Sequence, residues 1–173
     1  MSPEYREVQV RAATEADLGS LTDLYNHYVR ETPITFDTEP CTPEQRRSWL
    51  LSHPEDGPHR LLVARDRTYR SLLGYVTSTP FRIKPAYATS VEVSVYCARE
   101  VVGRGVGTLL YKALFEALAD EDVHRAYAGI ALPNEASVRL HTRFGFRHVG
   151  TYGEVGRKFG RYWDVAWYEK RLD

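Results

Sequence analysis

Apolar and polar residues alternate at the start of the chain. Residues 6–13 (REVQVRAA) have this period of two, which predicts a first strand. Thr14 has the chemistry of a helix N-cap, and residues 15–31 then repeat their apolar positions with a helical period. The apolar face of this helix is expected to consist of four side chains, Leu18, Leu21, Tyr25 and Tyr28.

A second helix is predicted after a loop over residues 32–42. Gln45 stands three residues after Thr42, and Pro43 occupies the first helical position between them. These three residue types at this spacing are typical of a capped helix start. Residues 53–58 (HPEDGP) are expected to end the helix.

The middle of the chain changes to short apolar runs. Residues 60–66 and 71–79 predict two strands joined by a polar turn, as in a hairpin. Residues 80–87 (PFRIKPAY) are expected to form a loop. A strand from about Val91 and a helix over about 105–119 follow.

The last third of the chain predicts one more strand and helix before a closing pair of strands. Residues 125–132 form an apolar run, and a short helix within residues 133–146 is expected to stop at Gly145. The final strands are expected at residues 147–156 and 161–172.

The predicted order is β, α, α, β, β, β, α, β, α, β, β. This order indicates a mixed α/β fold, with parallel strand pairing in the middle of the sheet and antiparallel pairing at its flanks. The length of 173 residues suits one domain with a proper core, so residues 1–173 are expected to form a single domain.

Charge and cysteine content narrow the function classes. Twenty-three basic residues balance 23 acidic ones, which argues against a broad surface for nucleic acid or an anionic membrane. No apolar run is long enough to span a membrane, and the N-terminus lacks the apolar region of a signal peptide. Cys41 and Cys97 are the only cysteines, and their spacing suggests no metal site. The expectation is a cytoplasmic protein with reduced thiols.

Three glycines, Gly103, Gly105 and Gly107, stand at every second position where the Val91 strand leads into a helix. Free N–H groups at a helix start, approached through glycine, suit a phosphate. No lysine follows as in a Walker loop, and the spacing is not that of the dinucleotide fingerprint. A tight turn without a ligand is the alternative interpretation.

Glu92 lies among valines, but side chains alternate along a strand. Val91, Val93 and Val95 are therefore expected on one face, and Glu92 on the other, where a cleft could receive it. A carboxylate in a partly apolar cleft can accept a proton from an amine. The alternative is a salt-bridged or exposed glutamate.

Asn134 and His141 are seven residues apart, so they share one helical face and are expected to look toward the same space. Asn134 also suits the helix N-cap. Just before the Glu92 strand, residues 80–87 bring together Arg82, Lys84 and Tyr87. These suit a small acidic ligand, although a solvated loop would use the same residues.

Several stretches together resemble one enzyme family. Residues 102–107 (VGRGVG) resemble the acetyl-CoA signature Gln/Arg-x-x-Gly-x-Gly/Ala of the GNAT N-acetyltransferases, with Val102 in place of the usual Gln or Arg. Residues 91–100, 130–146 and 156–165 resemble the phosphinothricin N-acetyltransferases and their relatives acting on methionine sulfoximine and methionine sulfone. The resemblance covers essentially the whole chain.

The resemblance implies the GNAT fold and acetyl-CoA as cosubstrate, with no metal. The main chain of the glycine loop would hold the pyrophosphate, and Asn134 the pantetheine arm. The implied cofactor-binding residues are Val95, Tyr96, Cys97, Gly103, Arg104, Gly105, Val106, Gly107, Thr108 and Asn134.

The resemblance also implies the catalytic and acceptor residues. Glu92 would be the general base, and His141 would protonate the leaving thiolate, assist Glu92 or orient the substrate. Phe36 would help to close the acceptor pocket beside Arg82, Lys84, Tyr87 and Glu92. Residues 156–165 would add a wall, either within one subunit or across the interface of a homodimer.

The leading hypothesis is therefore direct acetyl transfer from acetyl-CoA to the amino group of a small amino-acid analogue. Three acceptors fit the resemblance: phosphinothricin, methionine sulfoximine and methionine sulfone. Rival acceptors are a polyamine, an aminoglycoside or a protein N-terminus, against which the cations of residues 80–87 argue by like-charge repulsion. A CoA-binding protein without catalysis is the rival of another class.

Overall fold

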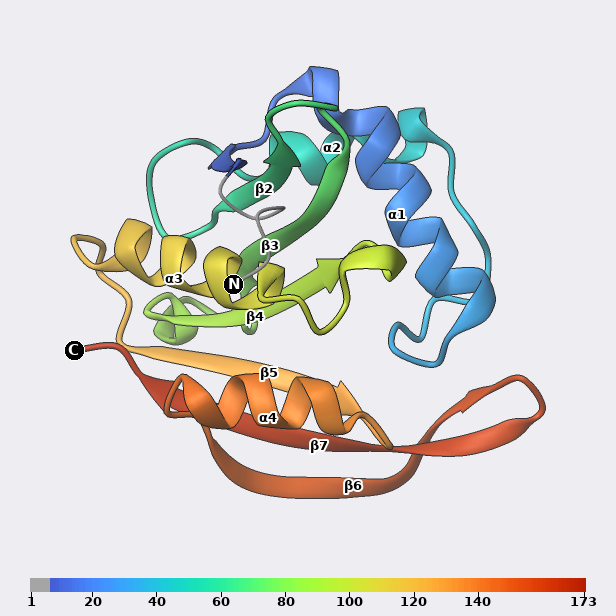
Figure 1. The fold of residues 1–173 in the computed structure, drawn as a ribbon. Helices are drawn as coiled ribbons and strands as arrows, with labels where there is room; N and C mark the ends of the chain where they lie inside the picture. The colour runs from blue at the N-terminus through green and yellow to red at the C-terminus, as the bar shows by residue number, and fades with distance from the viewer. Residues whose placement is uncertain (1–6) are drawn as a thin grey trace.

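A computed structural model describes residues 7–173. One seven-stranded sheet runs through the molecule in the order β1-β2-β3-β4-β5-β7-β6 (Figure 1). Its strands are β1 Val8–Ala12, β2 Leu61–Asp66, β3 Leu72–Pro80, β4 Ser90–Cys97, β5 Arg125–Ala131, β6 Arg147–Lys158 and β7 Arg161–Arg171. The α-helices are α1 Leu18–Glu31, α2 Pro43–Leu51, α3 Val106–Leu118 and α4 Glu135–Arg143.

The strand pairing agrees with the prediction. Neighbouring strands are antiparallel except for β4 and β5, which are parallel. β4 pairs along its length with β3, from Val91 opposite Pro80 to Cys97 opposite Gly74. Its pairing with β5 covers only Ser90 to Glu92. The two middle strands therefore separate just after Glu92.

Helices cover both faces of the sheet. On one face, α3 packs on the strands through Val106, Leu110 and Leu114, and α4 lies beside it (Figure 1). On the other face, α1 and α2 bury Leu21 and Leu50 against β2 and β3. Alternate residues of β2 thus enter two separate cores, with Leu62 and Ala64 in one and Leu61 and Val63 in the other, as the period of two requires.

The helix starts follow from local side-chain chemistry. Thr42 accepts a hydrogen bond from the Gln45 amide, and the Gln45 side chain accepts one from the Thr42 amide, so the predicted capping box of α2 is confirmed. Thr14 precedes a 3₁₀ turn, Glu15–Asp17, and its amide donates to the Asp17 carboxylate at 2.8 Å. The α-helix itself begins only at Leu18, later than the sequence predicts.

Some predicted boundaries need correction. The first strand is Val8–Ala12, shorter than residues 6–13, and residue 6 lies outside the described part of the chain. The predicted loop over residues 80–87 holds a 3₁₀ turn, Pro85–Tyr87, which Pro85 favours by fixing its own backbone angle. Of the helices described, none combines the length and apolarity needed to cross a membrane.

Candidate active site

The separation of β4 from β5 creates the centre of the site. Beyond Glu92, the β4 edge that faces β5 pairs with no strand of the described residues 7–173 up to Cys97. A small cavity of about 50 Å³ opens there, between the two strands and the start of α4. Val95, Tyr96 and Asn134 are among the residues that line it. Three of the residues predicted to hold the cosubstrate therefore meet at the gap between the strands.

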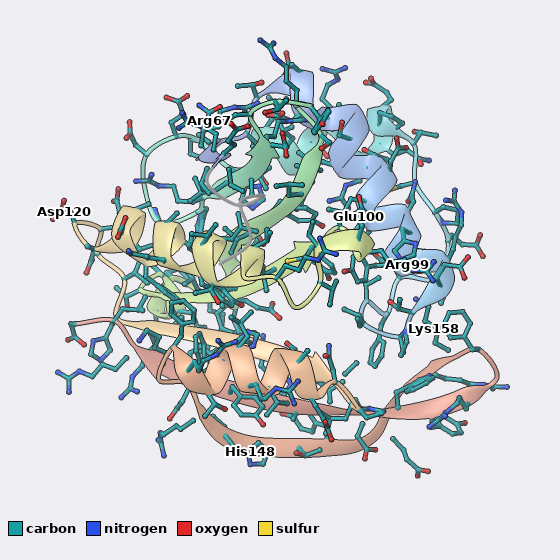
Figure 2. The ribbon with its side chains drawn as sticks, in the orientation of Figure 1. Arg67, Arg99, Glu100, Asp120, His148 and Lys158 are labelled. Carbon is teal, nitrogen blue, oxygen red and sulfur yellow. The ribbon has the colours of Figure 1, made fainter. Side chains whose placement is uncertain are left out.

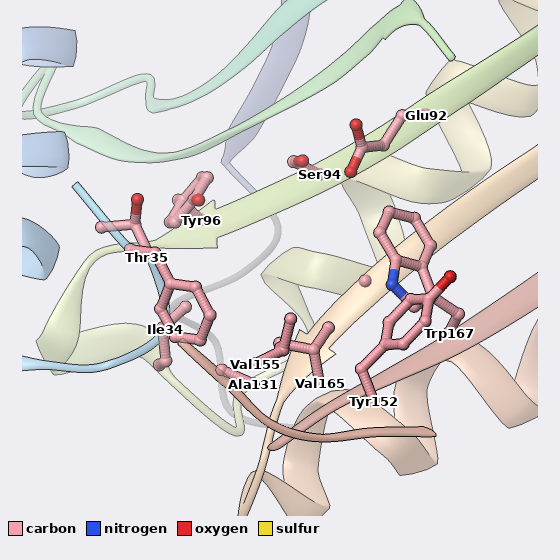
Figure 3. Close-up of a pocket in the computed structure, with 12 residues that line it drawn as sticks. Ile34, Thr35, Glu92, Ser94, Tyr96, Ala131, Tyr152, Val155, Val165 and Trp167 are labelled. Carbon is pink, nitrogen blue, oxygen red and sulfur yellow. The ribbon is translucent and has the colours of Figure 1, made fainter. Parts of the chain in front are cut away.

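A larger cavity of about 410 Å³ adjoins the small one and shares part of its lining (Figure 3). Its walls come from β4, from the loop after α1 and from the three strands at the far side of the sheet. The lining residues are Ile34, Thr35, Phe36, Glu92, Ser94, Tyr96, Gly129, Ala131, Tyr152, Val155, Val165 and Trp167.

Glu92 provides the one ionisable carboxylate of this lining. Glu92, Ser94 and Tyr96 follow each other along β4 into the cavity (Figure 3), while Val91 and Val93 are buried on the opposite face. The predicted alternation is thus confirmed. Burial raises the pKa of the Glu92 carboxyl, and the positive charge of Arg82 partly opposes this shift. A raised pKa is what a carboxylate needs in order to take a proton from an amine.

The loop after α1 is fastened to the β6–β7 hairpin. Lys158 is only 5% exposed, and its Nζ donates to the carbonyls of Thr32 and Thr35 at 2.7 Å each. Figure 2 shows Lys158 where the hairpin reaches this loop. Phe36 packs on Gly156, where a Cβ would lie 2.1 Å from the ring. The predicted contribution of Phe36 and of residues 156–165 to the cavity walls thus has a structural basis.

The glycine loop adopts a backbone that glycine favours. Gly103 and Gly105 have φ of +79° and +89°, and a Cβ at either position would meet no protein atom within 4 Å. Gly105 is the N-cap of α3, and the first helical bond of this end runs from the Leu109 amide to the Gly105 carbonyl. The preceding amides belong to the helix start, where intrahelical acceptors are lacking. This exposed backbone fits the pyrophosphate of acetyl-CoA.

The residues around this loop differ in exposure. Arg104 is exposed, Val106 is buried in the core, and Thr108 is half-buried. Gly107 faces inward: a Cβ there would lie 3.1 Å from Leu140 of α4, and its amide donates to the Cys97 thiol. Gly107 therefore serves the packing of α3 against α4, a role that the sequence pattern did not distinguish from phosphate binding.

Cys97 and Asn134 are both engaged within the fold. Burial raises the pKa of the Cys97 thiol to about 11, which keeps it protonated and a poor nucleophile. The Asn134 side-chain oxygen accepts a hydrogen bond from the Ser137 amide at 3.2 Å, which confirms the predicted N-cap of α4. Within residues 7–173, no cluster of three or more potential metal ligands occurs.

His141 lines the small cavity together with Asn134, so the prediction that both look toward one space is confirmed. His141 is nevertheless deeply buried, and its Nε2 lies 2.6 Å from the hydroxyl of Tyr111 on α3. Burial lowers the pKa of the imidazole. Sequence analysis missed Tyr111, because its helical spacing is that of an ordinary core residue.

The loop over residues 80–87 lies beside the large cavity, not in its wall. Arg82, Lys84 and Tyr87 are exposed, and none of them belongs to the lining. The Arg82 guanidinium stacks on Phe81 at 4.1 Å and is close enough to influence Glu92 electrostatically. The structure thus brings Arg82 toward the predicted base, but it does not bring Lys84 and Tyr87 into the cavity.

The far wall of the cavity was not predicted residue by residue. Val165 and Trp167 are two apart on β7 and so face the same side, a signal that strand periodicity could have provided. Tyr152 and Val155 lie on the partner strand β6, across an irregular stretch of the pairing. An irregular register cannot be read from alternation, so this pair lacked a usable signal.

Known proteins match this chain along nearly its whole length. The profile of the acetyltransferase (GNAT) domain family matches residues 10–167. A phosphinothricin N-acetyltransferase of Streptomyces coelicolor is 74% identical over 170 residues, which cover 98% of this chain and 99% of that protein. An L-methionine sulfoximine/L-methionine sulfone acetyltransferase of Pseudomonas aeruginosa is 33% identical over 164 residues, covering 95% and 94% of the two chains.

The fold has matching solved structures as well. The crystal structure of a GNAT superfamily phosphinothricin acetyltransferase from Sinorhizobium meliloti, in complex with AcCoA, has a TM-score of 0.90 to this chain at 27% identity. The match covers 96% of this chain and 89% of that one. The resemblance inferred from the sequence is confirmed, together with the fold class, the N-acetyltransferase activity and acetyl-CoA as acetyl donor. The chain belongs to the GNAT acetyltransferase family.

Proposed function

We propose that this N-acetyltransferase moves the acetyl group of acetyl-CoA to the amino group of phosphinothricin or of a close analogue, methionine sulfoximine or methionine sulfone. The main support for this proposal is the position of Glu92. It is the one carboxylate on the lining of a cavity that adjoins the gap between β4 and β5. The names of the relatives that match the full chain support this class of acceptor.

Glu92 is the general base of the proposed reaction. Its raised pKa lets the ionised carboxylate accept a proton from the acceptor's ammonium group, directly or through a water molecule. Acetyl-CoA supplies an activated thioester carbonyl when it is bound. The freed amine attacks that carbonyl, the new C–N bond replaces the C–S bond, and the thiolate leaves with CoA. The nitrogen loses a second proton as the amide forms, which balances the proton taken up by the thiolate, and the proton that Glu92 took from the ammonium group passes on to solvent.

The acetyl group passes directly between the two substrates. A covalent carrier would need a thiolate, and the pKa of about 11 keeps Cys97 protonated at neutral pH.

Gly103, Gly105 and the first amides of α3 would hold the pyrophosphate through main-chain N–H groups. The Asn134 oxygen already caps α4, so its amide nitrogen is the group offered to the pantetheine arm.

The acidic end of the acceptor is assigned to the loop over residues 80–87. The described lining of the large cavity contains no Lys or Arg, so an acceptor with carboxylate and phosphinate groups needs cations from the rim. Arg82 is the cation that influences Glu92, and Lys84 and Tyr87 lie on the same exposed loop. Phe36 and Trp167 would enclose the aliphatic part of the molecule.

The protein is proposed to act as a single-domain homodimer in the cytoplasm, where it detoxifies amino-acid analogues. The exposed apolar side chains on the β6–β7 hairpin support a homodimer, since they could be covered by a second copy. These side chains are Val149, Tyr152, Val155, Phe159 and Tyr162. Light scattering on the purified protein measures the oligomeric state and would contradict this part by showing only monomers.

A panel assay tests the acceptor. The protein is incubated with acetyl-CoA and one amine at a time, and the released CoA thiol is measured. The panel contains phosphinothricin, methionine sulfoximine, methionine sulfone, spermidine, an aminoglycoside and a peptide with a free N-terminus. We expect the highest kcat/KM for one of the three amino-acid analogues. A higher value for spermidine, the aminoglycoside or the peptide would overturn the proposal.

A further inference from the structure

Two buried side chains, Tyr111 of α3 and His141 of α4, meet where the small cavity touches the helix layer. They are 0% and 3% exposed. The Tyr111 hydroxyl lies 2.6 Å from His141 Nε2, and the rings are 5.1 Å apart in an edge-to-face arrangement. Both residues belong to the cavity lining. Tyr111 has no role in the acetyl-transfer chemistry described above.

The hydrogen bonds determine where the imidazole carries its proton. His141 Nδ1 lies 2.7 Å from the Ser137 carbonyl oxygen, which can only accept. Nδ1 therefore donates, and it carries the proton. In a neutral imidazole the other nitrogen is then an acceptor. The Tyr111 hydroxyl consequently donates to Nε2, and both ring nitrogens are occupied.

The surroundings favour the neutral imidazole. Burial lowers the pKa of His141, and within residues 7–173 no carboxylate forms an ion pair with it. The titratable groups that face the pair come from β4: Tyr96 and Cys97 act on Tyr111, and their own pKa values are raised to about 12 and 11. Phe146 closes another side of the imidazole at 5.1 Å. None of these neighbours supplies a charge near neutral pH.

We propose that Tyr111 is a positioning residue that holds His141 as the neutral Nδ1–H tautomer, with Nε2 engaged. Held in this way, His141 has no proton on Nε2 to give to a leaving thiolate. It acts as a fixed neutral wall of the cavity, and the local charge stays constant over the pH range in which a free histidine would titrate. The kinetic consequence rests on the proposed acetyl transfer, whereas the tautomer does not.

The tautomer is measured by two-bond ¹H–¹⁵N NMR correlations of the histidines, with His141→Asn used to identify the His141 signals. We expect the Nδ1–H pattern in the unsubstituted protein at pH 7. In Tyr111→Phe the neutral form loses a hydrogen-bond donor, so His141 should titrate at higher pH than in the parent. An Nε2–H pattern or an imidazolium in the parent would overturn the proposal, as would an unchanged titration in Tyr111→Phe.

Tyr28→Phe is the matched control, because it also removes a buried hydroxyl, one that donates to the Cys97 carbonyl. It should leave the tautomer and titration of His141 unchanged. If Tyr111→Phe does not fold, 3-fluorotyrosine incorporation replaces it. The more acidic hydroxyl is a stronger donor, so His141 should then titrate at lower pH than in the parent, and an unchanged titration contradicts the proposal.

The kinetic readout is the pH dependence of kcat/KM with phosphinothricin. Tyr111→Phe should show an additional ionisation on the acid side that the parent lacks. Profiles that superimpose after scaling would mean that Tyr111 has only a structural role. Because the NMR experiment needs no acceptor, failure of the proposed acceptor and failure of the positioning role give different results.

Discussion

The glycine loop and the acceptor cavity build their surfaces from different parts of the chain. The loop is one continuous segment, and it offers main-chain amides made accessible by Gly103 and Gly105. The cavity gathers side chains from β4, β5, β6, β7 and the loop after α1. A binding site made of backbone groups would tolerate Val102 as its flanking residue, whereas a site made of side chains would depend on each contributor. The proposed function thus places recognition of the cosubstrate and selection of the acceptor in separate parts of the fold.

The largest loss of activity is expected from a change at Glu92 in the acceptor cavity. Glu92→Gln should reduce kcat/KM for the amine by roughly 10²–10⁴-fold at neutral pH, the usual span for general acid–base catalysis, because glutamine cannot accept the proton. The pKa of Glu92 is raised, so the parent gains activity as pH rises and this carboxyl ionises. The defect should shrink at alkaline pH, where more of the amine is already deprotonated.

Glu116→Gln, an exposed carboxylate on α3, provides the control and should keep its activity. Calorimetric titration should give the same acetyl-CoA affinity for Glu92→Gln and the parent. A loss of kcat/KM that stays constant across the alkaline range would instead mean that Glu92 positions the acceptor.

A change in the glycine loop should weaken the binding of acetyl-CoA and leave the binding of the acceptor unchanged. Gly105→Val is expected to weaken acetyl-CoA binding about 100-fold, or by roughly 2.8 kcal/mol. The side chain would stand in open space that a ligand can enter, on a residue with φ of +89°. Calorimetry measures the affinity, and circular dichroism establishes that the variant is folded. Unchanged affinity in a folded protein would rule out the phosphate-binding interpretation.

Gly105→Asn separates the two causes of that loss. Asparagine tolerates a left-handed backbone better than valine does, so it reduces the strain and keeps the obstruction. Weak binding by both variants would assign the effect to the approach of the ligand.

The loop after α1 should respond to a single methyl group. Gly156→Ala would place its Cβ within the space of the Phe36 ring, so the ring has to move. We expect KM for the acceptor to rise about tenfold, equivalent to roughly 1.4 kcal/mol, with KM for acetyl-CoA unchanged. Gly150→Ala is the control on the same strand, since its Cβ meets no atom within 4 Å. Equal KM values for the two variants would show that Phe36 does not shape the cavity.

The smallest effect on the pH profile concerns Arg82, whose loss should also raise KM for the acceptor if residues 80–87 bind its acidic end as proposed. Its charge opposes the rise in the Glu92 pKa, so Arg82→Ala should raise that pKa further. The acid limb of kcat/KM then moves to higher pH, because the base is ionised only at higher pH. Lys84→Ala is the comparison, because Lys84 is not among the causes of the Glu92 shift. A similar displacement of the limb by both variants would mean that net charge, and not the position of Arg82, controls the base.

The difference between a loop made of contiguous residues and a cavity made of distant segments also explains what the sequence could predict. The element order, the parallel β4–β5 pair and the orientation of Glu92 follow from periodicity, which is a local property. The glycine loop could be found because its residues are contiguous. Lys158 and Tyr152 could not be assigned, since their roles depend on which distant segments the fold brings together. Tyr111 looked like core, and only the contact with α4 distinguishes it.

The short β4–β5 ladder has a consequence for the cohesion of the whole molecule. Strands β1–β4 form one half of the sheet and strands β5, β7 and β6 form the other. The two halves are joined by β4 and β5, which pair at only three positions, Ser90 to Glu92. Acetyl-CoA bound in the gap between β4 and β5 would contact both halves of the sheet and hold them together. Amide hydrogens along this gap should then exchange more slowly, and the melting temperature should climb with acetyl-CoA concentration. Bound there, acetyl-CoA would also contribute to the stability of the folded protein.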